Sequence, residues 1–137
     1  MVGPYFFFAV PAGWSDISIG SAIRAHGPGT YQAIVTSTEQ SSLTLEGVSA
    51  EFIASIKSQM GVDPEQTEAI TVGGSPANLM THHFVSQGLN VHQLTAICVR
   101  NGRAYEISYA NVAGTEGADR ALFLSVLGTF TFLSAAG

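Results

Sequence analysis

Residues 91–112 read VHQLTAICVR-NG-RAYEISYANV and have the pattern of a β-hairpin. Two runs of alternating residues flank Asn101-Gly102, and Asn-Gly is the strongest short signal for a type I′ turn. Such a turn fixes the register of both strands. It predicts seven cross-strand pairs: Cys98–Tyr105, Ala96–Ile107, Leu94–Tyr109, His92–Asn111, Val99–Ala104, Ile97–Glu106 and Thr95–Ser108. The first four pairs are mostly apolar and should face a core, whereas the last three are mixed and should be partly wet.

Further strands lead into this hairpin. Residues 5–10, 31–37, 68–72 and 77–86 are short runs rich in apolar residues and are typical of strands. If Gly88-Leu89 is the two-residue turn before the hairpin, it predicts three more pairs: Val85–His92, His83–Leu94 and His82–Thr95. The strands from residue 68 onwards then form an antiparallel meander.

Two amphipathic segments predict helices. In residues 45–60 the apolar side chains recur at helical spacing, with Ser42 or Thr44 available as N-cap and Gly61 after the last turn. Thr115 is placed to cap a second helix near the C-terminus. The order of elements predicts an α+β fold, in which an antiparallel sheet is flanked by two main helices within a single domain of 137 residues.

The composition is that of a folded and weakly charged protein. Hydrophobic residues make up 46% of the chain and charged residues 11%, with a net charge of −5 from ten acidic and five basic residues. The basic residues are scattered, and a nucleic-acid backbone requires a basic stripe, so we expect no nucleic-acid partner. The apolar clusters at 5–10 and 122–133 are shorter than the roughly 18–20 residues of a membrane span, so we expect no membrane insertion.

No signature of catalysis is present in the sequence. Cys98 is the only cysteine and lies on the core side of a predicted strand, where it is expected to be a small buried hydrophobe. The glycine pair at 73–74 lacks the lysine and spacing of a phosphate loop. We therefore expect no enzyme activity, no catalytic residue and no cofactor.

The histidines are the strongest candidates for chemistry. His82 and His83 are adjacent on a strand and must point to opposite faces. His83 and His92 are expected to lie diagonally on one face, within reach of a shared metal ion. Because zinc sites normally use three or four protein ligands, hydrogen-bonded imidazoles without a metal are the competing interpretation.

A polar row is expected on the other face of the sheet. His82, Thr95, Glu106 and Ser108 align across three strands and form a candidate ligand-binding set. A Ser-His-Glu triad is excluded, because Ser108 and Glu106 are neighbours on one strand and no glycine elbow raises the serine. Contact with solvent or with a covering segment is the other interpretation of this row.

Several short motifs together carry a family resemblance. They are FAVPAGW at 8–14, DISI at 16–19, ITVGGSPA at 70–77, GRAYEI at 102–107, and the closing helix from Phe123 to Phe130. This pattern resembles the PsbP/Mog/DcrB superfamily, whose members open with a strand ending in P-x-G-W and carry a V-x-G-x-P-A turn. The resemblance spans nearly the whole chain, but each motif is short and structural.

The resemblance implies an α/β/α sandwich and a mostly non-enzymatic role. PsbP is an extrinsic subunit of photosystem II, Mog binds the GTPase Ran, and bacterial DcrB-like members are cell-envelope proteins or lipoproteins. A related group serves as adaptor chaperones for type VI secretion effectors, and residues 14–19 are similar to the opening of those adaptors. A fold with such varied roles does not determine function by itself.

Three hypotheses follow for the function. The first is an accessory domain of a bacterial cell-envelope protein that binds another protein through its sheet or helix margins, and it predicts an exposed apolar patch. The second is a small-molecule or lipid-binding domain with a concave pocket around His82, Ile97 and Glu106. The third is a cytoplasmic adaptor chaperone, which requires a homodimer with a groove for helices. The cell envelope is expected if a leader or anchor precedes Met1 in the gene, and the cytoplasm if Met1 is the native start.

Overall fold

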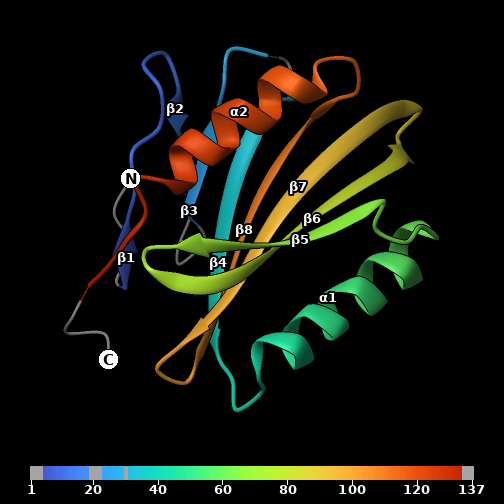
Figure 1. Cartoon of the computed structure of the whole chain (residues 1–137). Helices are drawn as coiled ribbons and strands as arrows, with labels where there is room; N and C mark the ends of the chain where they lie inside the picture. Colours follow the sequence, from blue (N-terminus) through green and yellow to red (C-terminus); the bar gives the residue numbers. More distant parts are fainter. Residues whose placement is uncertain (1–4, 19–22, 30, 134–137) are drawn as a thin grey trace.

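The computed structural model describes residues 5–18, 23–29 and 31–133, and these form a large antiparallel sheet with a helix on each face (Figure 1). Within these residues the sheet has seven strands in the order β2-β3-β4-β8-β7-β6-β5. β1 and β9 form a separate two-stranded ribbon. The elements are β1 (Phe6–Phe7), β2 (Ser15–Asp16), β3 (Ile23–His26), β4 (Ala33–Gln40), α1 (Leu45–Met60), β5 (Gln66–Val72), β6 (Ser75–Ser86), β7 (Leu89–Arg100), β8 (Arg103–Val112), α2 (Glu116–Leu127) and β9 (Thr131–Phe132).

The β7–β8 hairpin forms the centre of the sheet in the predicted register. All seven predicted pairs are present, including Cys98 opposite Tyr105 and Thr95 opposite Ser108. Both turn residues have positive φ, 51° at Asn101 and 74° at Gly102, as a type I′ turn requires. The α+β class is therefore confirmed together with the pairing on which it was based.

The predicted turn between β6 and β7 is wrong by one residue. The turn residues are Gln87 and Gly88, with φ of 52° and 78°, and not Gly88 and Leu89. His83 therefore lies directly opposite His92, and His82 lies opposite Gln93. The register shifts by two residues, so each side chain stays on its predicted face.

Two N-terminal elements differ from the sequence-based prediction. β3 was not predicted, because four residues beside a glycine-rich loop carry little periodic signal. β4 continues beyond the predicted end at residue 37 to Gln40, where Glu39 and Gln40 pair with Ala104 and Arg103 of β8. Backbone pairing with a long neighbouring strand outweighs the polar composition of this end.

The larger core lies between the sheet and α2. α2 contributes Phe123 and Val126, and the β1–β9 ribbon closes the side of this core with aromatic rings. The rings of Phe6 and Phe8 stack on Phe130 at centroid distances of 5.0 and 5.8 Å. Burial of each such side chain contributes about 1.5–3 kcal/mol, so this side of the sheet holds most of the hydrophobic stabilisation.

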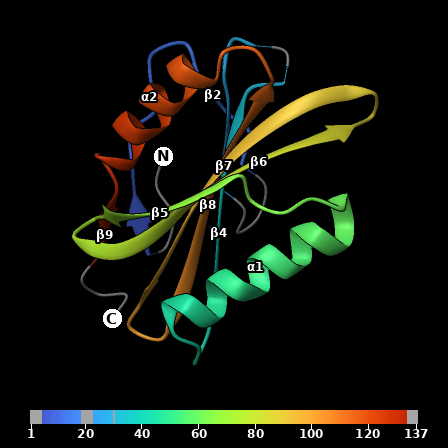
Figure 2. The ribbon, with the colours of Figure 1, turned by 45° about the vertical axis from the view of Figure 1, so that its right-hand side comes forward.

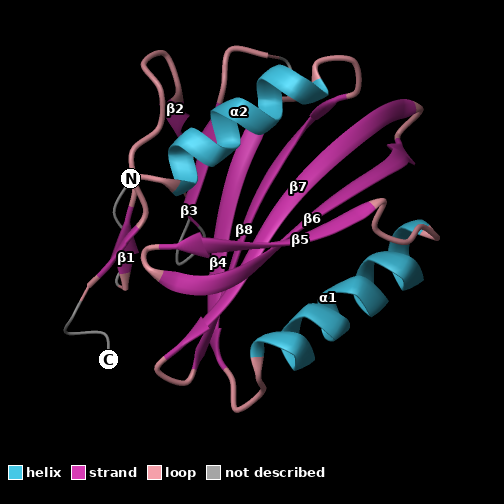
Figure 3. Cartoon of the chain, in the orientation of Figure 1, coloured by secondary structure: helices cyan, strands magenta, loops and turns pink. Residues whose placement is uncertain are grey.

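The smaller core lies under α1 on the opposite face (Figure 2). Its buried members are Phe52, Ile56, Met80 and Ile97. α1 has its predicted limits, with the Thr44 side chain accepting a hydrogen bond from the Gly47 amide at 3.1 Å and Gly61 at φ 74° after the last turn. Figure 3 shows the two helices on either side of the sheet. None of the helices in the described residues is long and apolar enough to cross a membrane.

Candidate functional site

A buried polar network joins the sheet to the N-terminal half of α2. His92 of β7 is 1% exposed, and its Nε2 lies 2.7 Å from Oδ2 of Asp119. The Tyr109 hydroxyl donates to Oδ1 of Asp119 at 2.6 Å, and the side-chain amide of Gln32 donates to the Tyr109 oxygen at 2.8 Å. Asp119 also accepts from Thr115 at 2.7 Å and Asn111 at 3.3 Å. One carboxylate thus gathers donors from β7, β8 and the N-cap residue of α2.

The network fixes the protonation of its members. Burial alone would raise the pKa of Asp119, but the hydrogen bonds from Tyr109, Thr115 and His92 outweigh burial and lower it. Burial, followed by the hydrogen bond to Asp119, raises the pKa of Tyr109 to about 12. Because the carboxylate accepts at Nε2 of His92, that ring nitrogen carries a proton. Nδ1 of His92 is buried and has no hydrogen-bond partner among the described residues.

His83 lies beside His92 and is held between two carboxylates. The two rings stack at a centroid distance of 5.8 Å. Nδ1 of His83 contacts the Glu65 carboxylate, and its Nε2 lies 3.9 Å from Glu116. The structure thus brings the predicted pair together, opposite each other and not diagonally. Among the residues that the structure describes, no group of three or more His, Cys, Asp or Glu side chains could hold a metal ion, so a metal at His83 and His92 stays a prediction with two ligands.

A small hollow opens above these two rings, which we call the histidine hollow. It has a volume of about 250 Å³. Its lining residues are Gln66, Thr81, His83, His92, Leu94, Glu116, Gly117 and Arg120. Arg120 is already paired with Glu68 at 2.6 Å. The hollow therefore combines the apolar side chain of Leu94 with the carboxylate of Glu116 and with a guanidinium that Glu68 already holds.

The predicted polar row lies on the α1 face, where it is partly covered. His82 and Thr95 have no exposed surface, and the ring of Phe52 from α1 meets His82 edge-on at 5.8 Å. Thr95 shares a hydrogen bond of 3.0 Å with Ser108. A ligand cannot reach His82 or Thr95 without moving α1, so these four residues do not form one accessible set.

Glu106 alone of that row borders a groove. The groove runs beside Ser37, Thr38, Val48 and Ala104 and has a volume of about 220 Å³. Burial, with a smaller contribution from the nearby Glu39 carboxylate, raises the pKa of Glu106. A raised carboxyl pKa in a groove is compatible with acid–base chemistry, but the Ser108 hydroxyl is hydrogen-bonded to Thr95 and not to Glu106.

An apolar hollow lies at the other end of the sheet, where the β6–β7 hairpin turns. Its volume is about 550 Å³. Its lining residues are Met60, Val62, His83, Phe84, Val85, Asn90, Val91 and Ala113. Val85 is 65% exposed and Met60 is 39% exposed. His83 lines both this apolar hollow and the histidine hollow.

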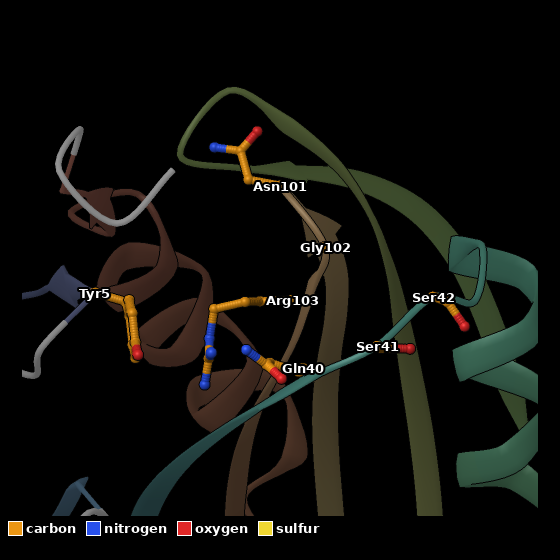
Figure 4. A pocket seen from close by; sticks show the side chains of 7 residues that line it. All are labelled: Tyr5, Gln40, Ser41, Ser42, Asn101, Gly102 and Arg103. Carbon is orange, nitrogen blue, oxygen red and sulfur yellow. The ribbon is translucent and has the colours of Figure 1, made fainter.

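A third hollow lies beside the β7–β8 turn (Figure 4). Arg103 is its charged residue, and the guanidinium is already engaged: it lies 4.0 Å above the Tyr5 ring, and its Nε donates to Thr38 at 3.3 Å. The side chains of Ser41, Ser42 and Asn101 do not converge with Arg103 on one point in this view. Gln40 is the strand partner of Arg103 and lies beside it in Figure 4, so the charged group of this hollow is already surrounded by neighbouring side chains.

Cys98 has the predicted surroundings. It is fully buried in the α2-side core, and burial raises the pKa of its thiol to about 12. A thiol in this state is a poor nucleophile.

Sequence reasoning missed Asp119 as the organiser of the polar network. Thr115 is the N-cap residue of α2 as predicted, but its hydroxyl donates to Asp119 and makes no cap hydrogen bond, so only the position of the cap is confirmed. One signal was available: His92 is polar yet lies on the core face, and a buried polar group requires a partner.

Comparison of the fold with known structures identifies its relatives. Cyanobacterial PsbP (CyanoP) from Synechocystis sp. PCC 6803 superposes with a TM-score of 0.71 at 14% identity, covering 93% of this chain and 86% of that chain. The chain has a PsbP-like fold. Identities this low establish the architecture alone.

Two further structures share the architecture of this PsbP-like domain. LpqN, involved in cell envelope biogenesis of Mycobacterium tuberculosis, matches with a TM-score of 0.60 at 14% identity over 93% of this chain and 82% of that one. A protein from Bacteroides thetaiotaomicron VPI-5482 matches with a TM-score of 0.68 at 12% identity, over 96% of this chain and 46% of that one. No family model and no curated protein matches the sequence.

Proposed function

We propose that this PsbP-like domain is a non-enzymatic accessory module of a bacterial cell envelope, and that it binds another protein at the apolar hollow. The observation that carries the proposal is the exposure of Val85 and Met60 at the rim of that hollow. Clustered exposed apolar side chains on a small domain mark interaction surfaces, whereas single ones need no explanation. The hollow rests on paired strands and on the end of a helix, so it is held in shape before binding.

The envelope assignment rests on structural relatives. LpqN is involved in cell envelope biogenesis, and it shares the architecture over most of both chains. The lipoprotein form known among DcrB-like proteins remains an expectation of the resemblance. A non-catalytic role is supported by the state of the groups with potential reactivity, since Cys98 is buried and Asp119 is saturated with donors.

The small-molecule and lipid alternative has less support. It relied on a concave pocket around His82, Ile97 and Glu106, and His82 and Ile97 lie under α1 with no exposed surface. The groove left beside Glu106 measures about 220 Å³. Pockets for drug-sized ligands are roughly 300–1,000 Å³. The adaptor-chaperone alternative needs a homodimer, and the oligomeric state in solution tests it.

Site-specific photo-cross-linking tests the proposed function. A photoreactive phenylalanine analogue is introduced at Val85 in the hollow, and in a control protein at Thr71, which is exposed near the opposite end of the sheet. Irradiation in cells should give a cross-linked band from position 85 that is absent from position 71. Cross-links that are equal at both positions, or absent from position 85, would refute the proposal.

A further inference from the structure

We infer that the partner engages this surface with a segment in which an apolar side chain is followed closely by a lysine or arginine. The inference rests on the proposed function, because it names the chemistry of the partner at the same surface. It is carried by two observations: the apolar hollow and the acidic groups around His83.

The apolar hollow and the histidine hollow are adjacent. His83 lines both of them, and it stands on β6 two residues before Val85. Residues i and i+2 of a strand lie on one face about 7 Å apart. A segment that buries one side chain beside Val85 therefore brings its next side chains to the histidine hollow.

The rim where the two hollows meet is acidic. Glu65 and Glu116 flank the His83 ring, with side chains 56% and 45% exposed. Asp63 is paired with Lys57 at 3.2 Å, and Glu68 is paired with Arg120 at 2.6 Å, so the basic groups of this region are already matched. Glu65 and Glu116 remain on either side of the His83 ring, and two carboxylates against one imidazole give this surface a net negative charge.

The acidic rim determines the chemistry of the matching group. Carboxylates accept hydrogen bonds, and an ammonium or guanidinium group donates hydrogen bonds only, so it matches Glu65 and Glu116 in both charge and hydrogen bonding.

An acidic segment or a membrane surface fits this site less well. A carboxylate would meet the carboxylates of Glu65 and Glu116 and would be repelled by them. Anionic lipids would be repelled by the same rim and by the net charge of −5 of the chain. Charge complementarity therefore favours a basic, apolar protein segment.

Titration with synthetic peptides tests the inference. The probes are the capped peptide Gly-Ser-Leu-Lys-Leu-Lys-Gly-Ser and a matched peptide with both lysines replaced by glutamate, each added to ¹⁵N-labelled protein at low salt. The lysine peptide should shift the amide resonances of His83, Val85 and Val91. Shifts of equal size with the glutamate peptide, or shifts that map elsewhere, would overturn the inference.

Two double variants distinguish the contribution of the rim carboxylates to peptide binding from the effect of the overall charge of the protein. Glu65→Gln with Glu116→Gln should weaken binding of the lysine peptide by about threefold to tenfold, as expected for two exposed charges. Glu46→Gln with Glu51→Gln removes the same charge from the exposed side of α1 and should leave the affinity unchanged. Equal weakening by both double variants would overturn the inference.

Two further outcomes are decisive. Binding to vesicles of phosphatidylglycerol and phosphatidylcholine in place of the peptide would also overturn the inference. If position 85 cross-links to a partner while the lysine peptide does not bind, the inference is wrong and the proposed function stands.

Discussion

Asp119 is the residue on which the polar side of the larger core depends. Its carboxylate accepts hydrogen bonds from His92, Tyr109, Thr115 and Asn111, and the first two donors are buried. Asp119→Asn turns one acceptor oxygen into a donor and removes the negative charge, so we expect a loss of roughly 2–4 kcal/mol in the free energy of unfolding. Urea unfolding measures this loss.

Asp63→Asn is the matched control for that change. Its side chain is 69% exposed and forms a surface pair with Lys57, so the same substitution should alter stability by less than about 0.5 kcal/mol. Similar losses at both positions would contradict the role given to Asp119.

His82 makes the stability of the α1 side depend on pH. Burial lowers the pKa of His82, although Asp63 and Glu65 oppose this, and neither ring nitrogen has a hydrogen-bond partner among the described residues. The folded state therefore holds His82 neutral. As the pH falls through the ordinary histidine pKa of about 6.5, the unfolded chain takes up the proton first, and the free energy of unfolding decreases.

Comparison with His82→Leu isolates this effect. Between about pH 7.5 and pH 5.5 the urea midpoint of the natural protein should decrease more than that of His82→Leu, because only the natural protein carries this titration. Parallel decreases in the two proteins would show that His82 does not control the acid response.

At single positions the sequence predicted which face of the sheet a side chain occupies better than it predicted which residue that side chain contacts. Cys98 and His92 were placed on the core face by alternation from Asn101, and both are buried there. The contact between His92 and Asp119 joins residues 27 apart on different elements, so no local pattern reveals it. Likewise, α1 covers His82 and Thr95 because of the path of the chain, which alternation does not encode.

The two helices differ in how firmly they are held. α2 belongs to the larger core, whereas α1 contributes Phe52 and Ile56 to a cluster of four buried residues. We therefore expect α1 to open at a lower free energy than β7 and β8, without unfolding of the sheet. Native-state hydrogen exchange in low urea measures the opening of each element. Exchange of α1 and β7 amides at the same free energy would contradict this expectation.

The two hairpin turns allow a reciprocal exchange of residues. Gln87 and Asn101 occupy the same first central position, at φ of 52° and 51°, and asparagine tolerates this conformation better than glutamine. Gln87→Asn should therefore stabilise the protein by about 0.5–1 kcal/mol, and Asn101→Gln should destabilise it by a similar amount. Thermal unfolding measures both, and changes of the same sign would contradict the turn assignment.

Elements were predictable where local chemistry and tertiary pairing agreed. α1 has a cap at Thr44, an apolar stripe and a terminal Gly61, and its limits were predicted to the residue. The β6–β7 turn misled the prediction because glutamine is unusual at positive φ, so Gly88 was taken as the first turn residue. β3 is held by pairing with β4, and its four residues carry no comparable signal.

For the whole molecule, the architecture does not specify the function. The sandwich follows from one hairpin register and two helices, and relatives at 12–14% identity share it. Function depends on the few side chains that this architecture exposes, which fold likeness does not specify. Here those side chains surround Val85 and His83, at the end of the sheet where the β6–β7 hairpin turns beside the last residue of α1.

Capture of partners from a bacterial envelope extract tests this account most directly. The tagged natural protein is compared with Val85→Asp, which places a charge in the apolar hollow, and with Thr71→Asp, which adds the same charge near the far end of the sheet. The account predicts that a protein retained by the natural domain and by Thr71→Asp is recovered at about one tenth of that level or less with Val85→Asp. Recovery of the same proteins in equal amounts with all three baits would contradict it.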